Sequence, residues 1–148
     1  MSSEKLLVFL GGTSGSNPWR LGLIERLAAR GIDRDVFFNP VVEDWNDEAR
    51  QREEEAKAAA DLLVFHLGNP QQPGNPIGAF SLVEATVAVC DTPERALLIF
   101  DLESVEGHAR RVLEETRKLL RARGSPAVLC ESLGEAEEYL ARRLLQGD

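Results

Sequence analysis

Short apolar segments recur along the chain, and a Gly, Asn or Asp residue follows each of the first four. The segments cover residues 6–10, 36–38, 62–67, 96–100 and 127–130. Segments that are apolar at almost every position are typical of strands covered on both faces, as in a parallel sheet. The pattern therefore predicts five buried strands.

The stretches between these segments have the spacing of helices. The first predicted helix begins at Asn17-Pro18, as cap and first helical position, and ends at Gly31. Its apolar residues include Trp19, Leu23 and Leu27, which lie three to four positions apart. The remaining helices are expected from Asp44 or Asn46 to Ala60, from Gly78 to about Ala88, from Ser104 to Gly124, and from the capping box of Ser132 and Glu135 onward.

Strands that alternate with helices in this way predict an α/β fold. We expect a three-layer sandwich around a five-stranded parallel sheet, in the flavodoxin- or Rossmann-like strand order 2-1-3-4-5. Residues 1–148 contain no repeat or linker pattern, so they are interpreted as a single domain.

Composition and charge narrow the range of partners. The formal net charge of the 148-residue chain is -8, and no stripe of Lys or Arg offsets it, so a nucleic acid partner is not expected. No apolar run approaches the roughly 20 residues that cross a membrane. The first five residues do not have the pattern of a signal peptide, and the expected location is the cytoplasm.

The two cysteines and two histidines do not predict a metal site. Cys90 and Cys130 lie in apolar surroundings outside any zinc-ligand spacing, and we expect both to be small buried residues. His66 and His108 have no second ligand at a fixed spacing. The sequence thus predicts neither a metal nor another cofactor.

A fold of this kind binds its ligand at the carboxyl ends of the strands. The candidate loops cover residues 11–18, 39–45, 68–78 and 101–108. The first, which starts at Gly11-Gly12-Thr13, offers glycines, hydroxyls and a helix N-terminus, although it is neither a Walker A motif nor GxGxxG. It is interpreted either as a ligand contact, which we favour, or as a tight connection.

The second loop contains two candidate contact residues with alternative interpretations. Asn39, before Pro40, either directs its amide into the crevice or only marks a turn. Trp45 either stacks on a ring of the ligand or packs beneath the following helix.

Two carboxylates lie where a merely solvated position explains them poorly. Glu84 is the only ionisable residue between Ala79 and Val89, and a lone carboxylate in an apolar helix indicates function or a strong partner. Glu53 lies at helical spacing from Ala49, beside the stripe expected to face the sheet. Glu53 is equally compatible with a structural role, in which Arg52 or Lys57 is its partner.

Several short motifs, taken in order, resemble the nucleoside 2-deoxyribosyltransferase-like family. They are Val8-Phe9-Leu10-Gly11-Gly12-Thr13 with Trp19-Arg20, Phe38-Asn39-Pro40 with Trp45, the Glu-rich stretch leading to Ala60-Asp61, and Ser81 to Glu84-Ala85. The resemblance extends from the first strand to about the fourth.

The resemblance implies roles for particular residues. Glu84 corresponds to the carboxylate that attacks the anomeric carbon of the sugar, and Glu53, with Glu54 as the fallback, to the second acidic residue. Gly78 stands where many relatives carry Asp or Ser. The expected substrate contacts are Gly11, Gly12, Thr13, Trp19, Arg20, Asn39, Trp45, Gly78 and Ser81.

The resulting hypothesis is an N-glycosyl enzyme that acts on a nucleoside or nucleotide, with hydrolysis slightly favoured over transfer. The alternative is a non-catalytic module that binds a nucleotide-like ligand on the same fold. A receiver or flavin domain is less well supported, because Gly11-Gly12 replaces the paired acids of a receiver.

We also expect a homo-oligomer with the third helix at the interface, because its apolar residues cover several faces. The resemblance implies that a neighbouring subunit often completes the site, here from Asp101, Ser104 or His108.

Overall fold

The structure is a computed structural model that describes residues 5–14, 18–42 and 44–146. Within them lie five strands, β1 (Val8–Gly12), β2 (Phe37–Phe38), β3 (Leu62–Leu67), β4 (Ala96–Phe100) and β5 (Val128–Cys130). They form one parallel sheet in the order β2-β1-β3-β4-β5, which confirms the predicted strand order. Asn17, the predicted cap of the first helix, lies outside the described residues.

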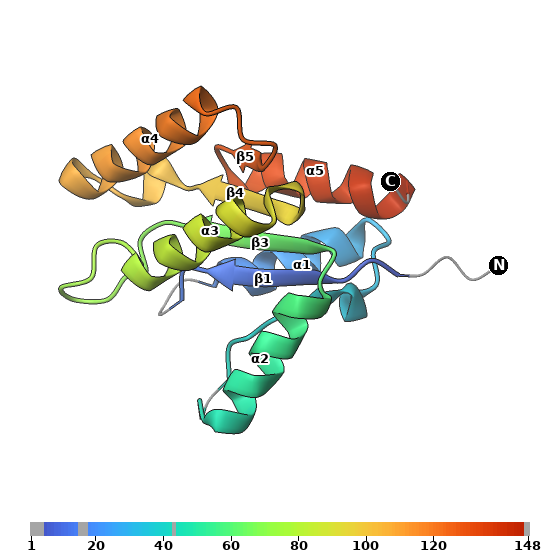
Figure 1. Cartoon of the computed structure of the whole chain (residues 1–148). Coiled ribbons are helices and arrows are strands. Elements are labelled where there is room, and N and C mark those ends of the chain that lie inside the picture. The colour runs from blue at the N-terminus through green and yellow to red at the C-terminus, as the bar shows by residue number, and fades with distance from the viewer. Residues whose placement is uncertain (1–4, 15–17, 43, 147–148) are drawn as a thin grey trace.

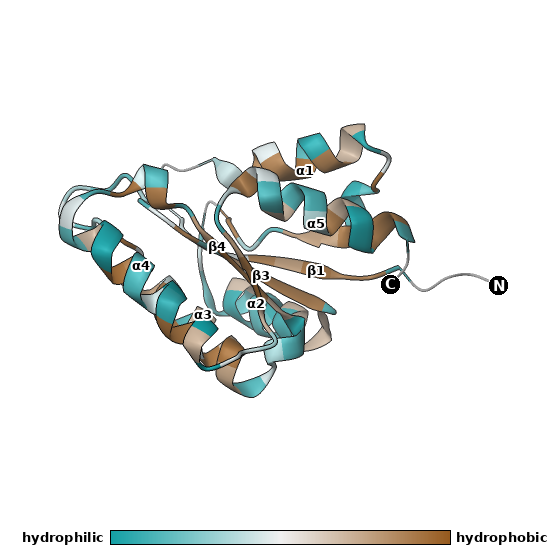
Figure 2. Cartoon of the chain, turned by 90° about the horizontal axis from the view of Figure 1, so that it is seen from above, coloured by the Kyte–Doolittle hydropathy of each residue, from teal (hydrophilic) through white to brown (hydrophobic). Residues whose placement is uncertain are grey.

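Helices cover both faces of this sheet and complete the predicted three-layer sandwich. The helices are α1 (Trp19–Ala29), α2 (Asp47–Ala59), α3 (Ala79–Asp91), α4 (Gly107–Ala122) and α5 (Leu133–Gln146). Figure 2 shows α1 and α5 on one side of the strands, and α2, α3 and α4 on the other. Figure 1 shows α2 projecting below the strands and α4 lying beyond β4.

Each face of the sheet has its own apolar core, because successive side chains of a strand point to opposite faces. On the α1 and α5 side, Leu10 and Val64 pack with Leu23 of α1 and Leu140 of α5. On the other side, Phe9 and Phe65 pack in a second cluster with Ala85 of α3 and Leu113 of α4. The sheet is thus covered on both faces, as its apolar strands predicted.

The element boundaries differ from the prediction where local hydrogen bonds compete with the regular pattern. Val36 ends a short 3-10 turn (Arg34–Val36), so β2 retains only Phe37 and Phe38. Ser104 lies in another 3-10 turn and donates to the carbonyl of Asp101 at 2.8 Å, so it does not begin the fourth helix. Asn46 is the cap of α2, and its side chain accepts a hydrogen bond from the amide of Ala49 at 2.9 Å.

The prediction for Cys90 is wrong, whereas the prediction for Cys130 is confirmed. Cys130 is buried, and burial raises the pKa of its thiol to about 12. Cys90 is exposed, because α3 directs Ala85 and Ala88 toward the sheet and Cys90 follows Val83 and Val87 on the outer face of the helix. The mixed apolar sequence of α3 conceals this difference between its two faces.

In the described part of the chain, no helix combines the length and the apolar character that crossing a membrane requires.

Candidate active site

A pocket of about 610 Å³ opens at the carboxyl end of β1, between α2 and the beginning of α3. This volume lies within the range of small-molecule sites. Its lining comes from the end of β1 and the loop after it, the start of α1, the segment before α2, α2 itself, the loop before α3 and the first turns of α3. The lining residues are Gly11, Gly12, Ser14, Arg20, Pro40, Val41, Val42, Trp45, Arg50, Glu53, Glu54, Lys57, Asn75, Gly78, Ala79, Phe80, Ser81 and Glu84.

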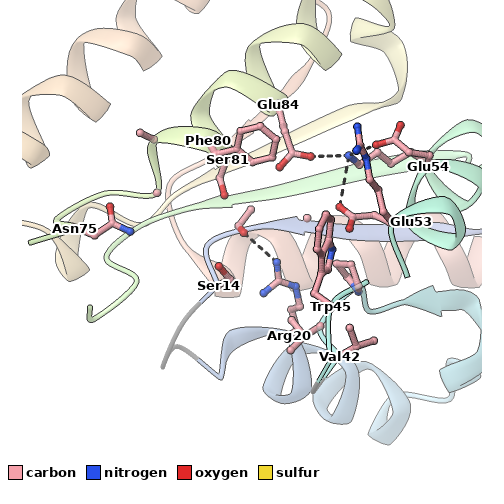
Figure 3. A pocket seen from close by; sticks show the side chains of 18 residues that line it. Ser14, Arg20, Val42, Trp45, Glu53, Glu54, Asn75, Phe80, Ser81 and Glu84 are labelled. Atoms are coloured by element: carbon pink, nitrogen blue, oxygen red, sulfur yellow. Dashed lines mark hydrogen bonds and ion pairs between the residues drawn. The ribbon is translucent and has the colours of Figure 1, made fainter. Parts of the chain in front are cut away.

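Three carboxylates of this pocket surround one lysine. The Nζ atom of Lys57 lies 2.6 Å from Oε2 of Glu84, 3.5 Å from Oε1 of Glu54 and 3.6 Å from Oε1 of Glu53. Figure 3 shows Glu84 approaching from α3, while Glu53 and Glu54 come from α2. The structure therefore brings together the three acidic residues identified in the sequence, although they belong to two separate helices.

The position of Glu84 follows from the faces of α3. Ser81, Ala85 and Ala88 are buried toward the sheet, whereas Phe80 and Val83 point outward. Glu84 lies between these faces, and 18% of its side chain is exposed. A carboxylate this shielded requires a partner, and the close contact with Lys57 supplies it.

The charges around Lys57 keep it protonated. Burial acts to lower the pKa of Lys57, but the hydrogen bond and the charge of Glu84, with smaller contributions from Glu54 and Glu53, raise it on balance. Lys57 also lies 5.6 Å from the centre of the Phe9 ring, which favours a cation over its face. The pocket thus holds an ammonium group beside the carboxylate of Glu84.

Arg20 lines the pocket, but most of its hydrogen-bonding capacity serves the backbone. Its Nε donates to the carbonyl of Leu10 at 2.8 Å, Nη2 to that of Gly12 at 3.0 Å, and Nη1 to that of Thr13 at 2.7 Å. Burial lowers the pKa of Arg20 to about 10, while the charges of Glu53 and Glu84 act in the opposite direction. Arg20 therefore holds the end of β1 and the first loop in place.

Thr13 and Trp19, two expected substrate contacts, lie behind the pocket rather than in its lining. Thr13 is fully buried, and its hydroxyl donates to the carbonyl of His66 at 2.9 Å and accepts from the amide of Gly68 at 2.9 Å. Trp19 is buried and donates through Nε1 to the carbonyl of Thr13 at 2.7 Å. Burial and these hydrogen bonds give both side chains structural positions.

Gly12 is required by the close approach of β1 to β3. Its φ angle is +98°, and an added Cβ would lie 2.3 Å from the backbone nitrogen of His66. A side chain here would be strained and would also collide with backbone, so only glycine fits. Gly12 and Gly11 nonetheless form part of the pocket lining.

The rim of the pocket is apolar and exposed. Trp45 is 61% exposed and Phe80 is 76% exposed, and Val41 and Val42 lie on the same rim. Trp45 therefore does not pack beneath α2, the structural alternative to stacking on a ligand. Asn39 is outside the lining, because its side chain accepts a hydrogen bond from the amide of Val41 within its own turn.

Several lining residues were not among the candidates from the sequence. Phe80 lies in the predicted apolar helix that begins at Gly78 but was not singled out in the sequence, and Lys57 was identified only as a possible structural partner of Glu53. For Lys57, the sequence offered one signal: it lies one helical turn after Glu53, a spacing at which the two side chains can pair. Asn75 lines the pocket, whereas Asn69, Gln71 and Gln72 of the same loop do not.

A separate polar pair lies on the α1 side of the sheet. Nε2 of His66 lies 3.0 Å from Oδ2 of Asp101, and the His66 ring stacks on Trp19 with their centres 4.9 Å apart. The hydrogen bond with His66 lowers the pKa of Asp101, against the opposing effect of burial. Among the described residues, no cluster of three or more His, Cys, Asp or Glu side chains has the arrangement of a metal site.

The fold and the site define an α/β protein with a small-molecule pocket near β1 and β3, where the strand order of the sheet reverses. Carboxylates line this pocket, and it has no phosphate-binding loop of the Walker A type among the described residues. The family described as nucleoside 2-deoxyribosyltransferase like matches residues 5–101, and the chain belongs to it. The matched region includes every residue that lines the pocket. No curated protein is significantly similar to the chain.

Proposed function

We propose that this protein is an N-glycosyl enzyme that cleaves the bond between a sugar and a base in a nucleoside or nucleotide, with Glu84 as the nucleophile. The observation that carries the proposal is the shielded carboxylate of Glu84, which shares one pocket with Glu53, Glu54 and Lys57. Membership of the family supports a nucleoside-type ligand.

In the proposed first step, an oxygen of Glu84 attacks the anomeric carbon of the sugar. The bond from carbon to the base nitrogen breaks, its electron pair leaves with the base, and the sugar becomes an ester of Glu84. Because Lys57 engages Oε2, Oε1 is the oxygen left to attack. Positive charge that develops on the sugar before the new bond is complete is stabilised by the carboxylate of Glu84 itself.

Glu53 is the proposed second acidic residue, and Glu54 is the fallback. The side chain of Glu53 is 22% exposed and that of Glu54 is 65% exposed, so Glu53 is better shielded from water. A protonated carboxyl here gives its proton to the departing base nitrogen. In the second step it takes a proton from the incoming molecule, and Glu84 is released as a carboxylate.

We propose that the base lies against the apolar rim formed by Trp45 and Phe80. Both rings are exposed, and an aromatic ring stacks on any planar base with little selectivity. The amide of Asn75 and the backbone of Gly11 and Gly12 supply polar contacts in the same pocket. Gly78 and Ser81, at the start of α3, complete the proposed contact set.

Water is the proposed acceptor in the second step. A transferase must exclude water and hold two bases in turn, but only Asn75 of the four amides in the loop after β3 lines the pocket. The exposed rim leaves a path for water. Transfer to a second base is the alternative, and product analysis with a labelled sugar donor, with and without excess second base, distinguishes them.

The activity is tested by incubating the protein with the ribosides and 2-deoxyribosides of the common bases, with and without a 5-phosphate, and measuring free base. Release by the wild type and by Glu55→Gln, but not by Glu84→Gln, supports the proposal. Glu55 is a matched control because it lies on α2 outside the pocket lining and is exposed. Binding without release by the wild type favours the non-catalytic module instead.

We further propose that the protein is a homo-oligomer in which α3 contributes to the interface. Its outer face, away from the pocket rim, carries Val83 and Val87, both more than half exposed. An apolar stripe of this kind on a helix favours burial against a second copy.

A further inference from the structure

Lys57 has a hydrogen-bonding capacity that its carboxylate partners do not exhaust. An ammonium group has three N–H donors. In the described part of the chain, Lys57 makes one short hydrogen bond, to Glu84 at 2.6 Å, whereas its contacts with Glu54 at 3.5 Å and Glu53 at 3.6 Å are longer than the usual range of about 2.7–3.2 Å. Because Lys57 also lines the pocket, one donor is available to a bound ligand.

The contact of Lys57 with Glu84 brings its ammonium group close to the carbon that Glu84 attacks. This step rests on the proposed function. A carboxylate that displaces a base attacks the anomeric carbon from the face opposite to that base. In a β-riboside, the hydroxyl on C2 lies on this same opposite face, next to the carbon under attack. A donor bound to the second oxygen of the attacking carboxylate is therefore within reach of the hydroxyl on C2.

The polar groups around Lys57 include both a donor and acceptors that a hydroxyl can pair with. A hydroxyl both accepts and donates, so it can accept from Lys57 and donate to Oε1 of Glu53 or to Glu84. A C2 hydrogen, as in a 2-deoxyriboside, leaves the ammonium donor without a partner in a pocket where the lysine side chain is only 23% exposed. Hydrogen bonds to the C2 hydroxyl of a sugar also strengthen in the transition state of glycoside cleavage.

We propose that Lys57 is a specificity-determining residue that binds the C2 hydroxyl of the sugar, so that the pocket selects ribosides over 2-deoxyribosides. The family description names a 2-deoxyribosyl group, and this inference assigns the present chain a different sugar. The basis is the contact of Lys57 with the nucleophile and its remaining donor.

The test compares each riboside with its 2-deoxyriboside in the wild type, Lys57→Met and Arg52→Met. Because 2-deoxyribosides are intrinsically more labile, the measured quantity is the ratio of kcat/KM for the two sugars, compared between variants. Lys57→Met is expected to lower the riboside to 2-deoxyriboside ratio about 10- to 100-fold, the usual effect of losing a hydrogen bond from a charged donor. Arg52 is the matched control, since it is an exposed cation of α2 outside the pocket.

Lys57→Arg and a binding measurement keep the test decisive if Lys57→Met folds poorly. Lys57→Arg retains a charged donor and is expected to keep more of the sugar selectivity than Lys57→Met. Calorimetry with the same nucleoside pairs gives the selectivity of binding, whether or not base is released. Riboside-selective binding without base release overturns the proposed activity but supports this inference.

Base release with a sugar ratio that Lys57→Met leaves unchanged overturns this inference and leaves the role of Glu84 intact. If the protein shows neither base release nor sugar-selective binding, both the proposed function and this inference are overturned.

Discussion

Replacement of Arg20 by Met separates a structural role of this arginine from a role in ligand binding. The guanidinium donates to three backbone carbonyls, and the carbonyl of Thr13 keeps a second donor in Trp19. Arg20→Met therefore leaves the carbonyls of Leu10 and Gly12 without this donor. Each buried acceptor left unpaired costs about 1–3 kcal/mol, so we expect a loss of about 3 kcal/mol of folding stability.

For a chain of 148 residues, 1 kcal/mol corresponds to about 2–4 °C in Tm, so the expected decrease in Tm is about 6–12 °C. Thermal unfolding followed by circular dichroism, with urea unfolding at 25 °C, measures the effect. Arg26→Met is the control, because Arg26 is exposed and makes a surface ion pair with Glu137 at 3.0 Å, a contact worth less than about 1 kcal/mol. An Arg20→Met protein that unfolds like the wild type but loses ligand affinity would refute the structural role.

Four further outcomes are expected. Glu84→Gln should lower base release about a thousandfold or more without changing Tm by more than a few degrees, and turnover close to that of the wild type would exclude Glu84 as nucleophile. Trp45→Ala should weaken binding of the cleaved nucleoside about tenfold in calorimetry, and unchanged affinity would place the base elsewhere. The hydrogen bond with His66 lowers the pKa of Asp101 in the folded protein below its ordinary value of 3.8. The contribution of ionised Asp101 to folding stability is therefore complete at a pH above 3.8 and is lost as the pH falls through the lower pKa of the folded state. Urea unfolding should therefore separate the wild type from Asp101→Asn at neutral pH and bring them together in acid; a constant difference contradicts this linkage. Sedimentation should show an oligomer for the wild type and smaller species for Val87→Glu, and a wild-type monomer at micromolar concentration would contradict an interface at α3.

The strand order could be predicted because burial leaves a strong local signal. The segments 62–67 and 96–100 are almost wholly apolar, and only central strands of a covered sheet require this pattern. The same reasoning identified Glu84, since one charge in an apolar helix is conspicuous. The shortening of β2 was not predictable. Val36 lies in a 3-10 turn rather than in the strand, and this turn depends on Oδ1 of Asp33, which accepts a hydrogen bond from the amide of Asp35 at 2.9 Å.

The parts of the site that escaped prediction depend on contacts between distant segments. Lys57 lies in a helix dense with Glu, where a lysine is expected to pair along its own helix, but its shortest contact is Glu84, 27 residues away. The hydroxyl of Thr13 resembled a ligand donor, but it meets backbone more than 50 residues further along the chain. Such pairings depend on how the strands bring their loops together, which local spacing does not record.

The hydrogen bonds of Thr13 connect the loop after β1 to the start of the loop after β3. The amide and hydroxyl of Thr13 both donate to the carbonyl of His66, at 2.7 and 2.9 Å, and the amide of Gly68 donates back to the hydroxyl. A movement of the first loop is therefore expected to move the start of the loop that carries Asn75. Thr13→Val removes the hydroxyl at nearly constant volume and leaves only the backbone hydrogen bond from the amide of residue 13 to His66. The amide of Gly68, which loses its acceptor, should therefore exchange its hydrogen faster while the centre of the sheet remains protected.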